Sequence, residues 1–230
     1  MAKSRGERVN GVLLLDKPGG VTSNSALQLA RRLLDAAKAG HTGTLDPMAT
    51  GLLPITFGEA TKFASDLLNA DKSYRATLRL GATTATGDAD GEVLERCSVK
   101  ASRQDVIIAL SSCVGTIEQV PPMHSALKLN GQPLYKLARA GVIVERAARR
   151  ITVQRLTLIE YAGESIVVDV DCSKGTYVRV LAEDVGRALG CGAHLCALRR
   201  TRAGRLRVED AITLSALEAM TLEARRQRLL

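Results

Sequence analysis

The feature that most constrains the fold is the segment at residues 40–54, which reads GHTGTLDPMATGLLP. Its glycines allow backbone conformations and close approaches that a side chain would forbid. Pro47 disfavours a helical conformation at Asp46 and favours an extended one. An apolar run at residues 52–55 then returns the chain to a core. We therefore expect a tight turn between buried segments that presents Asp46, a placement typical of a nucleophile or a base.

The composition indicates a globular protein with an aliphatic core. The chain has 230 residues, of which 46% are hydrophobic, 24% are charged and only 3% are aromatic, with no Trp. This length is enough to bury a sizeable core, as one large domain or two small ones. Because aromatic residues are scarce, each tyrosine is a candidate for an individual role.

The net charge is +8, and the densest basic run is at residues 199–207, where five arginines follow one another with no acid between Asp184 and Glu209. Such a field attracts polyanions and makes their binding salt-dependent. Charge alone is equally consistent with a solvated basic face, so nucleic-acid binding needs further support.

The cysteines and the N-terminal residues indicate where in the cell the protein is located. There are five cysteines, an odd number, and no C-x-x-C pair. This pattern argues against a disulfide framework and against a Cys-rich zinc site. The N-terminal residues are charged, and the apolar run after them, at residues 12–15, is too short for a signal peptide or a membrane span. We expect a cytoplasmic location and no membrane association.

The periodicity of apolar residues predicts a mixture of strands and helices. Thr22 or Ser23 can cap the first helix, and Ser102 with Asp105 forms a capping box for another. Strands are expected at residues 11–15, 74–80, 115–120, 151–161, 165–172 and about 195–208, and helices at about 24–37, 102–112, 177–189 and 215–230. Since there is no strict βαβ order, the sequence favours the α+β class.

No cofactor motif is complete. Residues 16–20 lack the Gly-Lys-Ser/Thr ending of a phosphate loop. A calcium loop would begin at Thr86 and end at Cys97, which cannot supply its strongest ligands. Residues 190–192 lack the third glycine of a dinucleotide fingerprint, and the three histidines share no metal-ligand spacing. We expect no cofactor and no metal.

Several segments, in order along the chain, resemble the TruB family of tRNA pseudouridine synthases. They are the segment around Asp46 and residues 11–23 (GVLLLDKPGGVTS), 72–76 (KSYRA), 172–179 (CSKGTYVR) and 197–201 (ALRRT). The resemblance implies a mixed, largely antiparallel central sheet flanked by helices, with an RNA-binding thumb inserted at about residues 122–150. It further implies a catalytic domain at residues 1–215. Residues 216–230 would then be a helix or linker, without a complete C-terminal RNA-binding domain.

The resemblance also implies a catalytic set. Asp46 would assist departure of the base from the anomeric carbon, by covalent attack or by stabilising positive charge. Arg179 would pair with Asp46 and keep it ionised. Tyr74 would stack on uracil and could relay a proton. Tyr177 and Leu198 would line the uracil pocket.

Two further RNA contacts are implied by the same resemblance. His41 would help to hold the flipped-out RNA loop, because a base must be extruded before an enzyme can reach its glycosidic bond. Asp88 and Asp90 lie in a turn that matches one near the RNA.

The implied reaction is the isomerisation of uridine 55 in the T arm of tRNA to pseudouridine, with C–N cleavage and C–C re-formation. It requires no cofactor, metal or second substrate. We expect a monomer that binds the T stem-loop of tRNA. Two alternatives stay open. A non-catalytic RNA-binding or tRNA-folding module would use the same basic surface, and a base-excising hydrolase would share the carboxylate but release free base.

Overall fold

The computed structural model describes residues 6–129 and 131–230. The chain divides into two compact units. One contains Met1–Ser73 and Arg199–Leu230, and the other contains Tyr74–Leu198. The chain passes from one unit to the other within β4 (Lys72–Leu80) and again within β12 (Ala193–Ala203).

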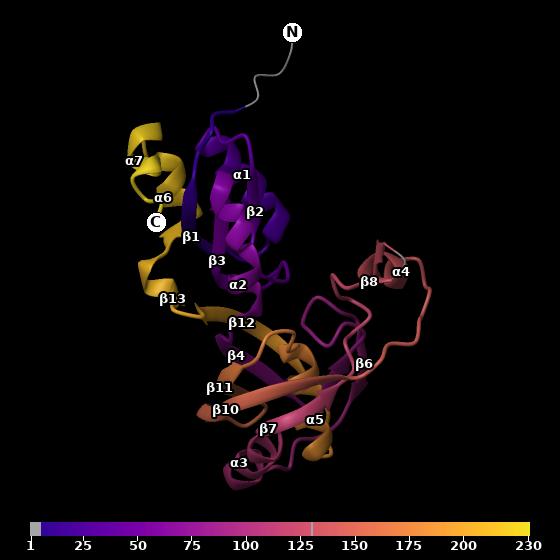
Figure 1. Ribbon diagram of the computed structural model, residues 1–230. Helices are drawn as coiled ribbons and strands as arrows, with labels where there is room; N and C mark the ends of the chain where they lie inside the picture. The colour runs from indigo at the N-terminus through magenta and orange to yellow at the C-terminus, as the bar shows by residue number, and fades with distance from the viewer. Residues whose placement is uncertain (1–5, 130) are drawn as a thin grey trace. The chain divides into compact units, whose positions relative to one another are not determined.

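The first unit is built on β1 (Gly11–Lys17) and β3 (Thr50–Phe57), which pair antiparallel from Gly11 opposite Phe57 to Lys17 opposite Gly51 (Figure 1). The C-terminal end of β12 pairs with β3 in parallel, with Arg199 opposite Thr50. The remaining elements of this unit are α1 (Ser23–Leu33), β2 (Ala39–His41), the 3₁₀ helix η1 (Gly58–Phe63), α2 (Ala64–Asn69), β13 (Leu206–Arg207), the 3₁₀ helix η2 (Val208–Asp210), β14 (Ile212–Thr213), α6 (Leu214–Ala219) and α7 (Leu222–Arg226).

The core of the first unit comes from the apolar run after the Asp46 segment. Leu52, Leu53, Ile55 and Phe57 of β3 are fully buried. A fully buried side chain of this kind contributes about 1.5–3 kcal/mol relative to an exposed one. The prediction that residues 52–55 return to a core is confirmed.

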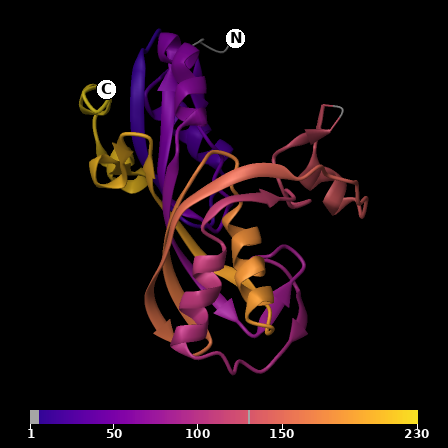
Figure 2. The ribbon, with the colours of Figure 1, turned by 60° about the horizontal axis from the view of Figure 1, so that its bottom comes forward.

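The second unit contains a sheet with the strand order β12, β4, β11 (Ser165–Cys172), β10 (Arg149–Ala162) and β7 (Gly115–Gln119). In this sheet β10 pairs antiparallel with both neighbours. Helices α3 (Arg103–Ser112) and α5 (Val178–Ala188) lie side by side in the curve of this sheet (Figure 2). On α5, buried apolar residues recur at helical spacing, and Leu181 and Val185 line one small cavity together with Leu78 and Val168 of the sheet. Two short strands, β5 (Ala82–Thr84) and β6 (Val93–Arg96), pair antiparallel with each other.

The expected excursion at residues 122–150 extends away from the sheet of the second unit (Figure 1). It carries a small hairpin, β8 (Lys128–Leu129) with β9 (Gln132–Pro133), and a short helix, α4 (Leu134–Arg139). On α4, the guanidinium of Arg139 lies 5.6 Å from the centre of the Tyr135 ring.

The α+β class with a largely antiparallel sheet is confirmed, but some element boundaries differ from the expectation. Helix α1 starts at Ser23 with Thr22 as its cap, yet it ends at Leu33 rather than at residue 37. Asp35 has a φ of 48°, in the left-handed region, and this conformation ends the helix.

The C-terminal segment is not one helix. Met220 is extended, with a ψ of 156°, and Thr221 caps a second helix by accepting a hydrogen bond from the amide of Ala224. The prediction of a single helix at 215–230 was therefore wrong, because a Thr that can cap a helix also favours a break before it. The final residue, Leu230, exchanges two backbone hydrogen bonds with Val12 of β1, each of 3.0 Å.

Candidate active site

Asp46 lies in the loop between β2 and β3 of the first unit, and it is half-buried. The loop is a tight turn, as expected, since the amide of Ala49 donates to the carbonyl of Asp46 at 3.1 Å. Gly43 has a φ of 78° and Gly51 a φ of 99°, conformations that favour glycine. A Cβ at Gly51 would lie 2.3 Å from the carbonyl oxygen of Arg200, so this glycine also allows β3 and β12 to approach closely.

Two side chains from the start of the chain hold this loop on either side of Asp46. The buried hydroxyl of Ser23 accepts from the amide of Leu45 at 2.8 Å and donates to its carbonyl at 2.9 Å. The fully buried Lys17 donates through Nζ to the carbonyl of Pro47 at 3.3 Å, and also to those of Pro18 and Val21. The residue before Asp46 and the residue after it are thus both fixed.

Arg200 holds the same loop from β12. Its side chain is 1% exposed. Its Nε donates to the carbonyl of Leu52 at 2.7 Å, and its Nη2 donates to that of Gly43 at 2.9 Å. Since the two carbonyls lie on either side of Asp46 along the chain, one planar guanidinium fixes both ends of the loop.

The first unit therefore places two buried cations around the Asp46 loop. Burial lowers the pKa of Lys17 from 10.5 to about 8; the charge of Asp46 opposes this shift and that of Arg200 adds to it. The Lys17 ammonium and the Asp46 carboxylate therefore attract each other.

His41, the predicted RNA contact, is the last residue of β2 and is half-buried. Burial, and then the charge of Arg200, lowers the pKa of its imidazole. A ring with a lowered pKa is neutral at pH 7, which suits stacking better than phosphate pairing. Its Nδ1 is buried and forms no hydrogen bond with any of the residues described.

Arg179 lies in the first turn of α5, in the second unit, and is 4% exposed. Its Nη1 donates to the carbonyl of Thr86 at 3.0 Å and its Nη2 to that of His124 at 2.7 Å. Its Nε lies 3.5 Å from Oδ2 of Asp88. Asp88 is itself 5% exposed, which leaves little of it for an RNA to contact.

The other predicted pocket residues also belong to the second unit. Tyr74 is on β4 and Tyr177 precedes α5, and both are half-buried. Leu198 is on β12 and is 9% exposed. Tyr177, Arg179 and Leu198 thus belong to the same unit as Tyr74, whereas Asp46 and His41 belong to the other. The pairing of Arg179 with Asp46 joins residues of the two units and stays a prediction.

Sequence reasoning assigned no role to Lys17, Arg200 or Gln119, whose buried side chains hold the backbone beside the predicted site residues. Lys17 and Arg200 lie inside the segments that resemble the TruB family, and this position is the signal that could have marked them as candidates. Gln119 lies within the strand predicted at residues 115–120. Its burial and its bonds to Tyr177 were not visible in the pattern.

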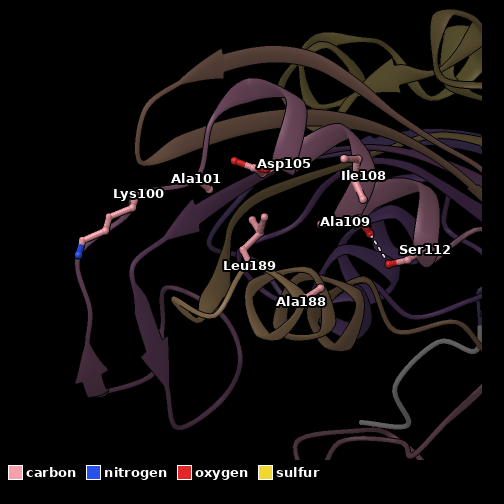
Figure 3. A pocket seen from close by; sticks show the side chains of 8 residues that line it. All are labelled: Lys100, Ala101, Asp105, Ile108, Ala109, Ser112, Ala188 and Leu189. Atoms are coloured by element: carbon pink, nitrogen blue, oxygen red, sulfur yellow. Dashed lines mark hydrogen bonds between the residues drawn. The ribbon is translucent and has the colours of Figure 1, made fainter.

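A hollow of about 450 Å³ lies between α3 and the end of α5 (Figure 3). Its walls include Lys100, Asp105, Ile108 and Leu189, and none of the predicted site residues. It therefore adds nothing to the site assignment. Within residues 6–129 and 131–230, no group of three or more His, Cys, Asp or Glu side chains could hold a metal ion. No helix in the same part of the chain is long and apolar enough to span a membrane.

Comparison with known families identifies the chain. The model described as TruB family pseudouridylate synthase (N terminal domain) matches residues 31–178, and the tRNA pseudouridylate synthase B C-terminal domain matches residues 179–230. The chain belongs to the TruB family. The expectation of a pseudouridine synthase, an isomerase, is thereby confirmed.

Relatives of this family named tRNA pseudouridine synthase B are similar along most of the chain. One from Aromatoleum aromaticum is 62% identical over 94% of this chain and 70% of its own length. Another from Dechloromonas aromatica is 57% identical over 97% of this chain and 75% of its own length. One from Cupriavidus taiwanensis is 61% identical over 92% of this chain and 68% of its own length.

Two solved structures at lower sequence identity share the fold. A chain of the Cbf5-Nop10-Gar1 complex superposes with a TM-score of 0.74 at 31% identity, over 96% of this chain and 59% of that chain. A chain of an H/ACA RNP bound to a substrate RNA containing 2'-deoxyuridine superposes with a TM-score of 0.67 at 30% identity, over 89% of this chain and 51% of that chain.

Proposed function

We propose that this TruB-family protein converts uridine 55 in the T arm of tRNA to pseudouridine. The observation that carries the proposal is the Asp46 loop, a carboxylate on a rigid turn that Ser23, Lys17 and Arg200 hold through the main chain. Such fixed placement is what a group acting on a reacting atom requires. The names of the bacterial relatives support tRNA as the substrate class. The solved structure of an H/ACA RNP bound to a substrate RNA supports RNA more generally.

The proposed reaction is an isomerisation, so it needs no second reactant. The target base leaves the RNA stack and enters the site, where Tyr74 stacks on it and Tyr177 and Leu198 enclose it. Asp46 attacks the anomeric carbon, or stabilises the positive charge there, as the bond to N1 of uracil breaks. The detached uracil rotates, its C5 bonds to the anomeric carbon, and the C5 proton is lost while N1 gains one.

The other residues have supporting parts in this proposal. Arg179 pairs with Asp46 and keeps it ionised. The neutral ring of His41 holds the RNA where the base has left. Residues 1–215 form the catalytic domain, with the thumb at 122–150 against the RNA, and residues 216–230 act as a linker. The protein acts as a monomer in the cytoplasm, where its five cysteines would stay reduced.

One assay tests the proposal and separates its rivals. Uridine-labelled tRNA is incubated with the protein, digested and analysed by chromatography. The proposal expects pseudouridine at position 55. Free uracil would instead indicate a base-excising hydrolase, and unchanged RNA that is nevertheless bound would indicate a non-catalytic module. Either result would overturn the proposed reaction.

Substitution tests the assignment of Asp46. Asp46→Asn keeps the shape of the side chain but removes the carboxylate, and we expect a loss of rate on the order of 10³-fold or more, as for other catalytic groups. Asp66→Asn, an exposed carboxylate on α2 of the same unit, is the matched control and should keep the wild-type rate. Pseudouridine formation by Asp46→Asn at the wild-type rate would refute the assignment.

A further inference from the structure

A buried glutamine in the second unit binds the backbone of one predicted pocket residue. Gln119, at the end of β7, is 3% exposed. Its Oε1 accepts a hydrogen bond from the amide of Tyr177 at 2.8 Å, and its Nε2 donates to the carbonyl of Tyr177 at 3.2 Å. The side-chain oxygen and nitrogen of Gln119 therefore bind the backbone amide and carbonyl of a single residue, Tyr177.

Tyr177 stands at the start of α5, where the side chain of the residue usually caps the helix. It is the N-cap residue of α5, with extended φ and ψ, and its side chain makes no capping hydrogen bond. The first turn of α5 also contains no acidic residue. Before it, Gly175 has a φ of 78° in an exposed loop. Since the side chain of the N-cap residue Tyr177 makes no capping hydrogen bond, Gln119 supplies a fixed point from another strand.

The segment that follows Gln119 is bonded to α5 at its other end. The carbonyl of His124 accepts from Nη2 of Arg179 at 2.7 Å. Pro121 and Pro122 lie between Gln119 and His124 and restrict the backbone of this segment. The segment therefore binds the start of α5 at two points, at Tyr177 through Gln119 and at Arg179 through the carbonyl of His124.

We propose that Gln119 is a positioning residue that fixes Tyr177, and through it the first turn of α5, so that Tyr177 and Arg179 are in place before the RNA binds. The inference rests on the proposed function, in which Tyr177 lines the uracil pocket and Arg179 pairs with Asp46. Rotation of the Tyr177 backbone would move both side chains together, because only one residue separates them. A displacement of 1 Å in a catalytic group can cost on the order of 100-fold in rate.

Two substitutions at this position remove different parts of the contact. Gln119→Met keeps the length of the side chain and removes both hydrogen bonds. We expect its kcat to fall about 10- to 100-fold while KM for a T-arm stem-loop stays within about threefold of wild type. Gln119→Glu keeps the acceptor for the Tyr177 amide, and its protonated form also restores the donor.

The Glu variant adds a pH profile that a simple loss of packing would not produce. Burial raises the pKa of a carboxylic acid, in extreme cases to about 8–9. We therefore expect the kcat of Gln119→Glu, divided by that of wild type at the same pH, to rise as the pH falls from about 8 to about 6. A flat ratio would contradict the proposed use of both hydrogen bonds.

Tyr161→Phe is the matched control. It removes one hydrogen bond of 2.6 Å, from the Tyr161 hydroxyl to the carbonyl of Ala101, within the same unit but at none of the predicted site residues. It should lower the melting temperature and leave kcat unchanged. If folded Gln119→Met keeps the wild-type kcat, or loses only as much as Tyr161→Phe, Gln119 has no positioning role.

Hydrogen exchange separates failure of this inference from failure of the proposed function. The Tyr177 amide should exchange slowly in wild type and at least tenfold faster in Gln119→Met, while amides in the middle of α5 keep their protection. This measurement needs no RNA. Absence of pseudouridine with wild-type protein would refute the function alone, whereas unchanged exchange at Tyr177 would refute the role of Gln119.

Discussion

The two units hold their predicted catalytic residues by different means. In the first unit, the buried cations Lys17 and Arg200 bind main-chain carbonyls of the loop that carries Asp46. In the second, the predicted catalytic residue Arg179 is itself the buried cation, and it binds carbonyls of two separate segments. Loss of a loop-holding cation should therefore appear first as lost stability. Loss of Arg179 should appear in stability and in rate together.

Among the substitutions that test this contrast between the units, Arg179→Lys should have the largest effect. Lysine keeps the charge but cannot reach Thr86, His124 and Asp88 at once, because it lacks the planar guanidinium. We expect kcat to fall on the order of 100-fold and the free energy of unfolding to fall by about 3 kcal/mol, as when a buried charge pair is broken. Rates and urea denaturation curves on the same preparation measure the two losses.

Arg187→Lys controls for the substitution itself. Arg187 is on the same helix but is exposed, and its partner Asp184 is three residues before it. An exposed pair contributes about 0–1 kcal/mol, so neither rate nor stability should change measurably. If Arg179→Lys lost stability and kept its rate, Arg179 would resemble the loop-holding cations and the contrast between the units would fail.

Lys17→Met should lower the stability of the protein more than it lowers kcat. Methionine fills the hydrocarbon space of the lysine but leaves the carbonyls of Pro18, Val21 and Pro47 without the Nζ donor. We expect a loss of about 3 kcal/mol, which for a chain of this size is a fall in melting temperature of about 6–12 °C. The folded variant should keep more of its kcat than Arg179→Lys does.

Lys62→Met is the control for the removal of a lysine from the same unit. Lys62 is exposed and pairs with Glu59 one turn earlier. Its substitution should change the melting temperature by no more than about 4 °C. A larger loss of kcat in Lys17→Met than in Arg179→Lys would show that Lys17 acts on the reaction and not only on the loop.

Local signals explain which parts of the molecule the sequence predicted. The Asp46 turn follows from Pro47 and its neighbouring glycines, and the start of α1 follows from the hydroxyl of Thr22. The ends of elements were less accurate where a single backbone conformation decides them. Asp35 ends α1 with a positive φ, a conformation that few residues other than glycine adopt and that the apolar periodicity does not reveal.

Long-range contacts explain what the sequence could not predict. Arg200 binds carbonyls that lie 148 and 157 residues away along the chain, at Leu52 and Gly43. In the sequence it is one of five arginines in a basic run, and nothing in that run distinguishes this buried arginine from the half-buried and exposed ones. Gln119 and Tyr177 are likewise separated by 58 residues. A backbone carbonyl is an acceptor at every position, so only the fold decides which one a buried cation meets.

The pH dependence of stability should isolate Lys17. Its pKa is about 8 in the folded protein and 10.5 when exposed, so between these values the unfolded chain binds more protons at this site. Stability from this group therefore rises with pH across that window, by up to about 3 kcal/mol. The wild-type free energy of unfolding, minus that of Lys17→Met, should be larger at pH 10 than at pH 7.5. A constant difference would mean that burial does not shift this lysine.

Apart from the control substitutions, the smallest effect should follow from Ser102→Ala, which touches neither the Asp46 loop nor Arg179. Ser102 caps α3 in the second unit: its hydroxyl accepts from the amide of Asp105 at 3.3 Å, and the Asp105 carboxylate accepts from the amide of Ser102 at 2.8 Å. Loss of such a cap costs about 1 kcal/mol. We expect the melting temperature to fall by about 2–4 °C with kcat and KM unchanged. A fall in kcat would mean that the start of α3 is coupled to the first turn of α5, and that the ties of Arg179 and Gln119 do not by themselves fix it.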